Sequence, residues 1–260
     1  MLWGVDEIVL FFVGVLVFLG VVEAAFRLGL HHRDPADDAN KAHITALQTA
    51  LLGLLALLLG FTFAMAVSRF ETRKSLVLEE ANAVGKAQWR SQLLPPTHSQ
   101  KIAGLLREYV AARIDFHLAA GDDKRLQAAT AAASDIERKI WADATALEAE
   151  DPHSSPTLLF VQSINDMIDV NEKRRVALEN HVPEPVHHLL FFVATGALGF
   201  IAYGCGLTGR RRLVSTGLFA ALIAFVLTFI LDIDQPRSGL IQVSQESMIR
   251  LAERLSQDAP

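Results

Sequence analysis

Apolar residues gather in four windows along this chain, and charged residues crowd between them. The windows cover residues 8–30, 44–67, 186–207 and 213–231. A helix of about 20 apolar residues crosses the ~30 Å hydrocarbon core of a bilayer. Each window reaches about that length. The pattern therefore predicts an all-α integral membrane protein with four transmembrane helices arranged in two hairpins.

The segment between the second and third windows keeps a helical spacing of apolar residues without becoming continuously apolar. Residues 69–94 extend the helix of the second window up to Pro95-Pro96, because proline cannot continue a helix. Further helices are expected over 97–120, with Thr97 as N-cap, and over 124–150 and 155–180. The predicted organisation is a first transmembrane hairpin (1–68), a helical soluble section (69–185), a second transmembrane hairpin (186–232) and a soluble C-terminal tail (233–260).

Composition and motifs exclude several classes of function. The net charge is −5 and no basic block resembles a nucleic-acid surface. Cys205 is the only cysteine, so neither an intrachain disulfide nor a cysteine-based zinc cluster is expected. The pairs His31-His32 and His187-His188 are poor metal sites, because neighbouring side chains on a helix point in different directions. No catalytic motif appears, and neither an enzyme, a cofactor nor a metal is predicted.

Basic residues are distributed almost evenly between the two ends of the predicted spans. The short loops carry Arg27, Arg33, Lys41 and residues 210–212. Long segments translocate largely regardless of their charge, so the short loops weigh more in setting orientation. The helical section is therefore expected on the extracytoplasmic side of the membrane.

Small residues form a stripe along the second window. Its members recur at spacings of three and four: Thr49, Gly53, Ala56, Gly60 and Ala64. Such a stripe lets helices approach closely in lipid, so packing within one subunit is the simpler interpretation. The alternative is a pore wall or a seam between subunits, with Phe61 or Phe63 as a hydrophobic constriction. Polar residues that lipid would not favour add to the second interpretation: Thr45, Gln48, Thr49 and Thr62.

An acidic and a basic residue lie one helical turn apart in the first window, Glu23 and Arg27. Ionisable residues within a span point to ion conduction or proton coupling. Alternatively, Arg27 extends to the interface and Glu23 pairs with it.

Two aspartates, Asp232 and Asp234, follow the fourth window. In an oligomer they could coordinate a cation or form an acidic ring at a pore mouth. Alternatively, they orient the turn at Pro236, with Arg237 as an ion-pair partner. The sequence does not decide between these two roles.

Three runs of residues carry a resemblance to a known family. They are LLGFTFAMAVSRFETRK at 58–74, EEANAVG at 79–85 and LDIDQPRSGLIQVS at 231–244. Together they resemble the bacterial bestrophin-like family of four-span membrane proteins, a domain of unknown function, in matching order from about residue 44 to 250. The resemblance implies a bacterial inner-membrane protein related to bestrophins, which are pentameric anion channels whose second helix lines the pore. The calcium-binding acidic clasp of bestrophins has no equivalent in this sequence.

These observations favour a homo-oligomeric ion channel in the lipid bilayer, with the second transmembrane helix lining a path for inorganic ions. One alternative is a non-conducting membrane scaffold or sensor whose helical section binds a partner. Another is an ion-coupled transporter or motor component that uses Glu23.

Overall fold

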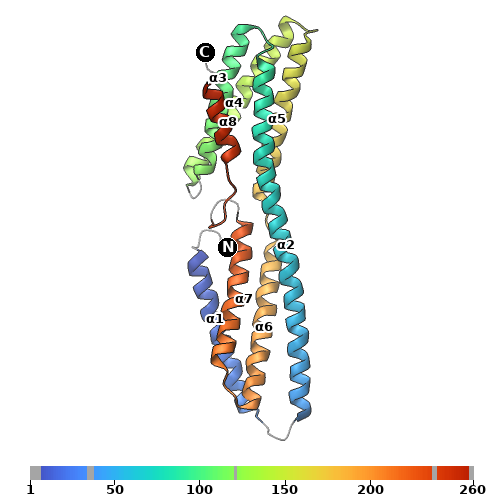
Figure 1. Ribbon diagram of the computed structural model, residues 1–260, viewed down its shortest axis with the longest axis vertical. Helices are drawn as coiled ribbons and strands as arrows, with labels where there is room; N and C mark the ends of the chain where they lie inside the picture. The colour runs from blue at the N-terminus through green and yellow to red at the C-terminus, as the bar shows by residue number, and fades with distance from the viewer. Residues whose placement is uncertain (1–6, 34–37, 120–121, 236–238, 258–260) are drawn as a thin grey trace. The chain divides into compact units, whose positions relative to one another are not determined.

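The computed structural model describes residues 7–33, 38–119, 122–235 and 239–257, and the elements in these ranges are α-helices (Figure 1). The all-α fold class is therefore confirmed. In chain order the helices are α1 (Glu7–His31), α2 (Asp38–Ser91), α3 (Pro96–Leu118), α4 (Asp123–Glu150), α5 (Ser155–Glu179), α6 (Glu184–Thr208), α7 (Leu213–Asp234) and α8 (Glu246–Gln257).

Four helical stretches are long and apolar enough to cross a membrane, as the sequence predicted. They are Ile8–His31, Ala42–Ser91, Ser155–Thr208 and Leu213–Asp234. The third stretch comprises two helices, α5 and α6, and its continuously apolar part is α6. The protein is thus a multi-pass membrane protein, and α1, α6, α7 and the first half of α2 are its spans.

The described residues divide into two compact units. The membrane unit consists of 7–33, 38–68, 181–235 and 239–241, and the helical unit of 69–119, 122–180 and 242–257. Helix α2 belongs to the membrane unit up to Ser68 and to the helical unit from Arg69. Residues 233–260 were predicted as a separate soluble tail, without α8, which belongs to the helical unit.

Helix α6 contacts the other three spans of the membrane unit. It packs on α1 and on α7, to which residues 209–212 join it, and Gln48 of α2 donates a hydrogen bond to the Phe200 carbonyl. Gly29 of α1 and Gly206 of α6 bring the two helices close together, since added Cβ atoms there would lie within 3 Å of the facing backbone. Small residues permit such contacts between helices in lipid. The predicted pairing of α1 with α2 in a first hairpin stays a prediction.

An apolar core holds the helical unit together, and the second half of α2, α3, α4, α5 and α8 contribute to it. Tyr109, Ile140 and Phe160 are fully buried within this core. Helix α8 contributes one apolar side at helical spacing, Met248, Leu251 and Leu255. Burying apolar surface away from water is the main favourable term for such a core.

The helix boundaries of the helical unit follow the capping signals, with one correction. The carboxylate of Asp122 accepts hydrogen bonds from two backbone N–H groups and caps α4, and Ser154 caps α5. The prediction of Thr97 as the N-cap of α3 is wrong, because α3 already begins at Pro96. Proline is favoured in the first turn, where its missing N–H would have had no helical partner.

Candidate functional site

The small-residue stripe of α2 lies on an exposed face of the membrane unit. Its five members, Thr49, Gly53, Ala56, Gly60 and Ala64, are all exposed. A Cβ atom added at Gly53 or Gly60 would meet no other atom within 4 Å. Among the described residues, then, no neighbouring helix uses these two glycines for close packing. We refer to these five residues as the small face of α2.

The two aromatic residues beside the small face differ in their surroundings. Phe61 is 66% exposed. Phe63 stacks on Phe229 of α7, with ring centroids 6.2 Å apart. The Phe63 ring is therefore held against its own subunit, whereas the exposed Phe61 ring is the better candidate for a constriction.

Two of the four polar residues of this span point into the membrane unit and do not add to the small face. The Thr62 hydroxyl is buried and donates to the Leu58 carbonyl at 2.8 Å. The Gln48 amide donates to the Phe200 carbonyl at 2.6 Å. Both groups satisfy backbone carbonyls inside the unit, and the exposed polarity near the small face reduces to Thr45 and Thr49.

Glu23 is paired with two arginines. Its carboxylate accepts from Arg27 Nε at 2.7 Å and from Arg211 Nη2 at 2.5 Å. The guanidinium of Arg211 also lies over the Phe26 ring, 5.5 Å from its centroid. The i,i+4 spacing indicated the first partner. The second was missed because it comes from the loop between α6 and α7, far away in sequence.

The two aspartates at the end of α7 are buried, and both bind backbone N–H groups of their own unit. The carboxylate of Asp232 accepts from Leu240 at 2.8 Å and from Ile241 at 3.2 Å. A Cβ atom at Gly239 would lie only 2.6 Å from Asp232 Oδ1, so the glycine of the motif leaves room for this carboxylate.

Asp234 fixes the start of the third span in the same way. Its Oδ2 atom accepts from the Val182 N–H at 2.8 Å and lies 3.9 Å from His181 Nδ1. The suggested partner Arg237 lies outside the described residues. These contacts give both carboxylates a role in orienting the chain where it enters and leaves the membrane unit.

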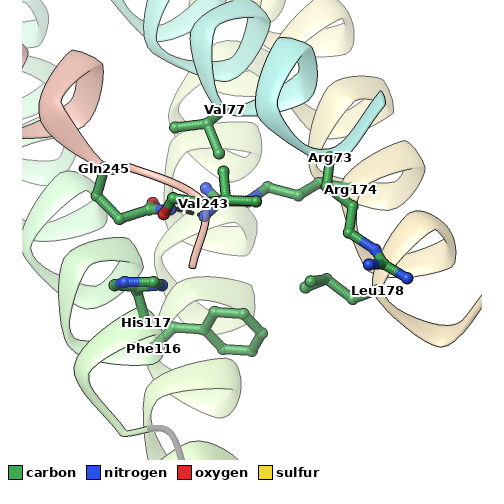
Figure 2. A pocket seen from close by; sticks show the side chains of 8 residues that line it. All are labelled: Arg73, Val77, Phe116, His117, Arg174, Leu178, Val243 and Gln245. Carbon is green, nitrogen blue, oxygen red and sulfur yellow. Dashed lines mark hydrogen bonds between the residues drawn. The ribbon is translucent and has the colours of Figure 1, made fainter. Parts of the chain in front are cut away.

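A buried cluster of charges lies in the helical unit, around Glu80 of α2. Glu80 is fully buried and accepts hydrogen bonds from Tyr109 at 2.9 Å, from Arg113 Nε at 2.6 Å and from Arg174 Nη1 at 2.5 Å. Arg174 also donates from Nη2 to Gln245 at 2.7 Å, as Figure 2 shows. The cluster joins α2, α3, α5 and the segment before α8.

Electrostatics keep Glu80 ionised. Burial alone would raise the pKa of this carboxyl, but Arg113 and Arg174 outweigh that effect and lower it. Burial and the neighbouring Glu80 carboxylate raise the pKa of Tyr109 well above its usual value, so the hydroxyl stays a donor. A buried charge is tolerated when it is paired and hydrogen-bonded, and Glu80 meets both conditions.

A cavity of about 20 Å³ adjoins this cluster. Its lining comprises Arg73, Val77, Phe116, His117, Arg174, Leu178, Val243 and Gln245 (Figure 2). Such a volume holds about one water molecule. Burial, and then Arg174, lower the pKa of His117, so this side chain is neutral at pH 7. We interpret the cluster as a structural one, with no room for a substrate.

Glu80 lies in the family motif at 79–85, but the sequence pattern was not used to predict a role for it. A usable signal was present, because Val77, Glu80, Val84 and Ala87 recur at spacings of three and four, on one face of the helix. A charge on an apolar face indicates a buried partner. Which partners it has depends on α3 and α5. Elsewhere in the described ranges, His, Cys, Asp and Glu form no group of three or more that could hold a metal ion.

Comparison with known proteins completes this picture. A crystal structure of a bacterial bestrophin homolog from Klebsiella pneumoniae carrying one substitution is similar, with a TM-score of 0.67 and 16% identity, covering 98% of this chain and 99% of that one. A second structure of that homolog gives a TM-score of 0.66 and 16% identity, covering 98% of each chain. No curated protein matches. The model of the bestrophin-like domain matches residues 11–248, and the chain therefore belongs to the bestrophin-like family.

Proposed function

We propose that the protein is a homo-oligomeric ion channel of the bacterial inner membrane, with the small face of α2 lining the conduction path. The family and the four membrane spans support the channel class. The observation that carries the assignment of α2 is the exposure of Gly53 and Gly60, where an added Cβ atom would meet no other described residue within 4 Å.

A helix presenting small residues and hydroxyls is suited to a pore wall. Gly60 and Ala64 narrow the path little. In an oligomer, the exposed Phe61 side chains of the subunits would together form an apolar constriction. Hydrophobic constrictions of this kind gate channels by excluding water. Subunit number and ion preference are further parts of the proposal: a pentamer and anions follow from the family resemblance.

Ion flux from liposomes containing the purified protein tests the channel. Gly60→Leu places a bulky side chain on the small face and should reduce flux strongly, while assembly is unchanged. Gly20→Leu is the matched control, because Gly20 of α1 also has no atom within 4 Å of an added Cβ. It introduces the same side chain on another span and should leave flux unchanged.

The outcome that overturns the proposal is specific. If wild-type liposomes carry neither chloride nor potassium flux across lipid compositions and voltages, the protein does not conduct. If flux is present but Gly60→Leu and Gly20→Leu behave alike, the path does not follow α2. Cross-linking of the wild type in detergent, read as a ladder of subunits, tests the pentamer separately.

The proposed orientation has its own measurement. A cysteine introduced at the exposed Glu150, in a Cys205→Ser background, reports the side of the helical unit. If that unit is extracytoplasmic, a membrane-impermeant thiol reagent should label intact spheroplasts. Labelling that requires membrane disruption would place the helical unit in the cytoplasm.

Exposed apolar side chains on the helical unit favour a second candidate function, that of a membrane scaffold or sensor. Trp89 is 64% exposed and Leu158 67%, and both lie at the end of the helical unit where Arg90 donates to the Leu159 carbonyl at 2.8 Å. Clustered exposed apolar residues mark interaction surfaces, either for a partner or for neighbouring subunits. Two results together would support the scaffold. The wild type would carry no ion flux, and it would retain a stoichiometric partner that the Trp89→Ser variant loses.

Two arginines hold Glu23, which weighs against a transporter or motor that loads protons on this carboxylate. Glu23→Gln keeps the shape of the side chain and removes its charge. A channel lined by α2 should retain most of its flux in this variant. Loss of all transport with intact assembly would instead favour the transporter.

A further inference from the structure

The membrane unit contains a groove of about 380 Å³ between α1, α6 and α7. Its walls are mostly apolar, and Val13, Val17 and Phe191, which line it, are 50%, 42% and 45% exposed. The volume lies within the range of small-molecule sites. Because it opens on membrane-spanning helices, its apolar part is accessible to lipid.

One end of the groove is polar. It is lined there by Glu184 and His187 at the start of α6 and by Asp234 and Gln235 at the end of α7. The start of α1, the start of α6 and the end of α7 lie at the same end of the membrane unit (Figure 1). The apolar window of α6 begins at residue 186, and that of α7 ends at residue 231. The polar end of the groove therefore lies at the boundary of the hydrocarbon region.

A buried atom in this groove has no partner. The Nε2 atom of His187 is buried and makes no hydrogen bond with any described residue. A buried polar nitrogen without a partner is costly, and in native proteins such groups are usually satisfied by a bound molecule or by water. Because His187 lines the groove, a turn of its ring would bring this buried atom to a hydrogen-bonding group of a molecule in the groove.

Charge narrows the choice of this molecule. Among the described residues that line the groove, the charged ones are carboxylates, Glu184 and Asp234. Asp234 already binds the Val182 N–H, and Glu184 is exposed. An anionic headgroup would be repelled here, whereas an ammonium group would be attracted.

We propose that the groove between α1, α6 and α7 is a binding site for a zwitterionic phospholipid with a primary ammonium headgroup. One acyl chain occupies the apolar part, the His187 ring turns so that Nε2 donates a hydrogen bond to a phosphate or ester oxygen, and the ammonium group pairs with Glu184. This site is separate from the small face of α2, and its occupancy does not depend on ion conduction.

Native mass spectrometry of the full-length protein in detergent tests the site, with phosphatidylethanolamine and phosphatidylglycerol of identical acyl chains as probes. The wild type should retain phosphatidylethanolamine about tenfold more tightly, the effect of one charge-assisted hydrogen bond. Glu184→Gln should remove this preference, because Glu184 binds the group that differs between the two lipids. His187→Leu should weaken retention of both lipids alike, and His43→Leu, at an exposed histidine of α2 outside the groove, should change neither.

Filling the groove tests the acyl chain. Val17→Trp should abolish retention of the lipid. Leu16→Trp is the matched control, since Leu16 is 68% exposed and does not line the groove, and retention should stay at the wild-type level. Should Val17→Trp fail to fold, the headgroup preference of Glu184→Gln still decides.

Three results would overturn the proposal. They are equal retention of the two lipids by the wild type, equal retention by Val17→Trp and Leu16→Trp, and a structure of the oligomer in which a helix of a second copy fills the groove.

Discussion

The membrane unit and the helical unit are stabilised by different interactions, although α2 belongs to both. In the membrane unit, glycines bring α1 and α6 into backbone contact at Gly29 and Gly206. In the helical unit, an apolar core surrounds a carboxylate held by two arginines. Lipid tails are as apolar as leucine, so burial from lipid drives little association and close packing must serve instead. In water, apolar burial is the driving force, and charges within the core must be paired.

The two halves of α2 display this contrast along one helix. Up to Ser68 its buried positions include Leu55 and Ala66, and its exposed residues, among them Leu57 and Phe61, are mostly apolar and none is charged within the span. From Arg69 onwards it buries Arg73 and Glu80 as well as apolar residues. Arg73 donates to the Ala177 and Asn180 carbonyls at the end of α5, where a helix presents carbonyls without helical partners. Which residues each half of α2 can bury therefore depends on whether lipid or water surrounds that half.

The largest effect is expected from Glu80→Gln. It keeps the shape of the side chain but leaves the buried guanidinium groups of Arg113 and Arg174 without their counter-charge. Breaking a buried pair costs about 3–5 kcal/mol. Thermal unfolding in detergent measures the loss. Glu79→Gln, at the exposed neighbouring residue, should stay within about 0.5 kcal/mol of the wild type, and equal losses in the two variants would contradict the buried-pair interpretation.

Acidification should weaken the same pair gradually. The arginines hold the pKa of Glu80 below its ordinary value of 4.5 in the folded protein, against the opposing effect of burial. A carboxyl with a lowered folded pKa stabilises the fold fully above its unfolded pKa, and this contribution is lost as the pH falls through the folded pKa. The unfolding temperature should therefore fall below about pH 4.5 more steeply in the wild type than in Glu80→Gln, and parallel curves would exclude this linkage.

A smaller effect is expected from Gly29→Ala in the membrane unit. The new Cβ atom would lie 2.2 Å from the Tyr203 carbonyl oxygen, and backbone atoms cannot move aside as a flexible side chain can. Overpacking of this kind costs about 1–3 kcal/mol. Gly20→Ala on the same helix, with open space around its Cβ, should leave stability unchanged or raise it by up to about 1 kcal/mol. Indistinguishable unfolding temperatures would refute close packing as the stabilising interaction.

The smallest effect is expected from Gln48→Leu. This variant removes the hydrogen bond to the Phe200 carbonyl and places an apolar side chain of similar size between α2 and α6. Hydrogen bonds between membrane helices contribute about 0.6 kcal/mol on average. Unfolding in a denaturing detergent should resolve a small loss, with Thr49→Val on the exposed face as the neutral control. A loss as large as that of Glu80→Gln would remove the contrast between the two units.

The sequence predicted the elements better than the contacts. The expected helices over 97–120, 124–150 and 155–180 appear as α3, α4 and α5 with ends shifted by at most two residues, because prolines and capping residues act locally. The i,i+4 spacing of Glu23 and Arg27 predicted their ion pair for the same reason. Helix α8 was not predicted because its apolar side is short. Such a short amphipathic helix is stabilised only when it packs against an apolar core.

The candidate site shows where local patterns end. The stripe of small residues on α2 was visible in the sequence, but whether those residues pack against a neighbouring helix or remain exposed depends on the other spans. Gln48 and Thr62 were predicted to add to a polar face of the second span, but in the structure both side chains bind backbone carbonyls inside the membrane unit. Arg211 reaches Glu23 across the bundle, a contact that no spacing rule encodes.

Sequence patterns predicted the four membrane spans, the helical section between them and the family motifs near Glu80 and Asp232. Apolar length, helical period and turn residues are local properties, so they can be read along the chain. The tertiary structure alone decided that Glu80 pairs with Arg113 and Arg174, and that a groove with a polar end forms between α1, α6 and α7. Burial and pairing are properties of side chains that meet in space, and only the packing of distant helices brings them together.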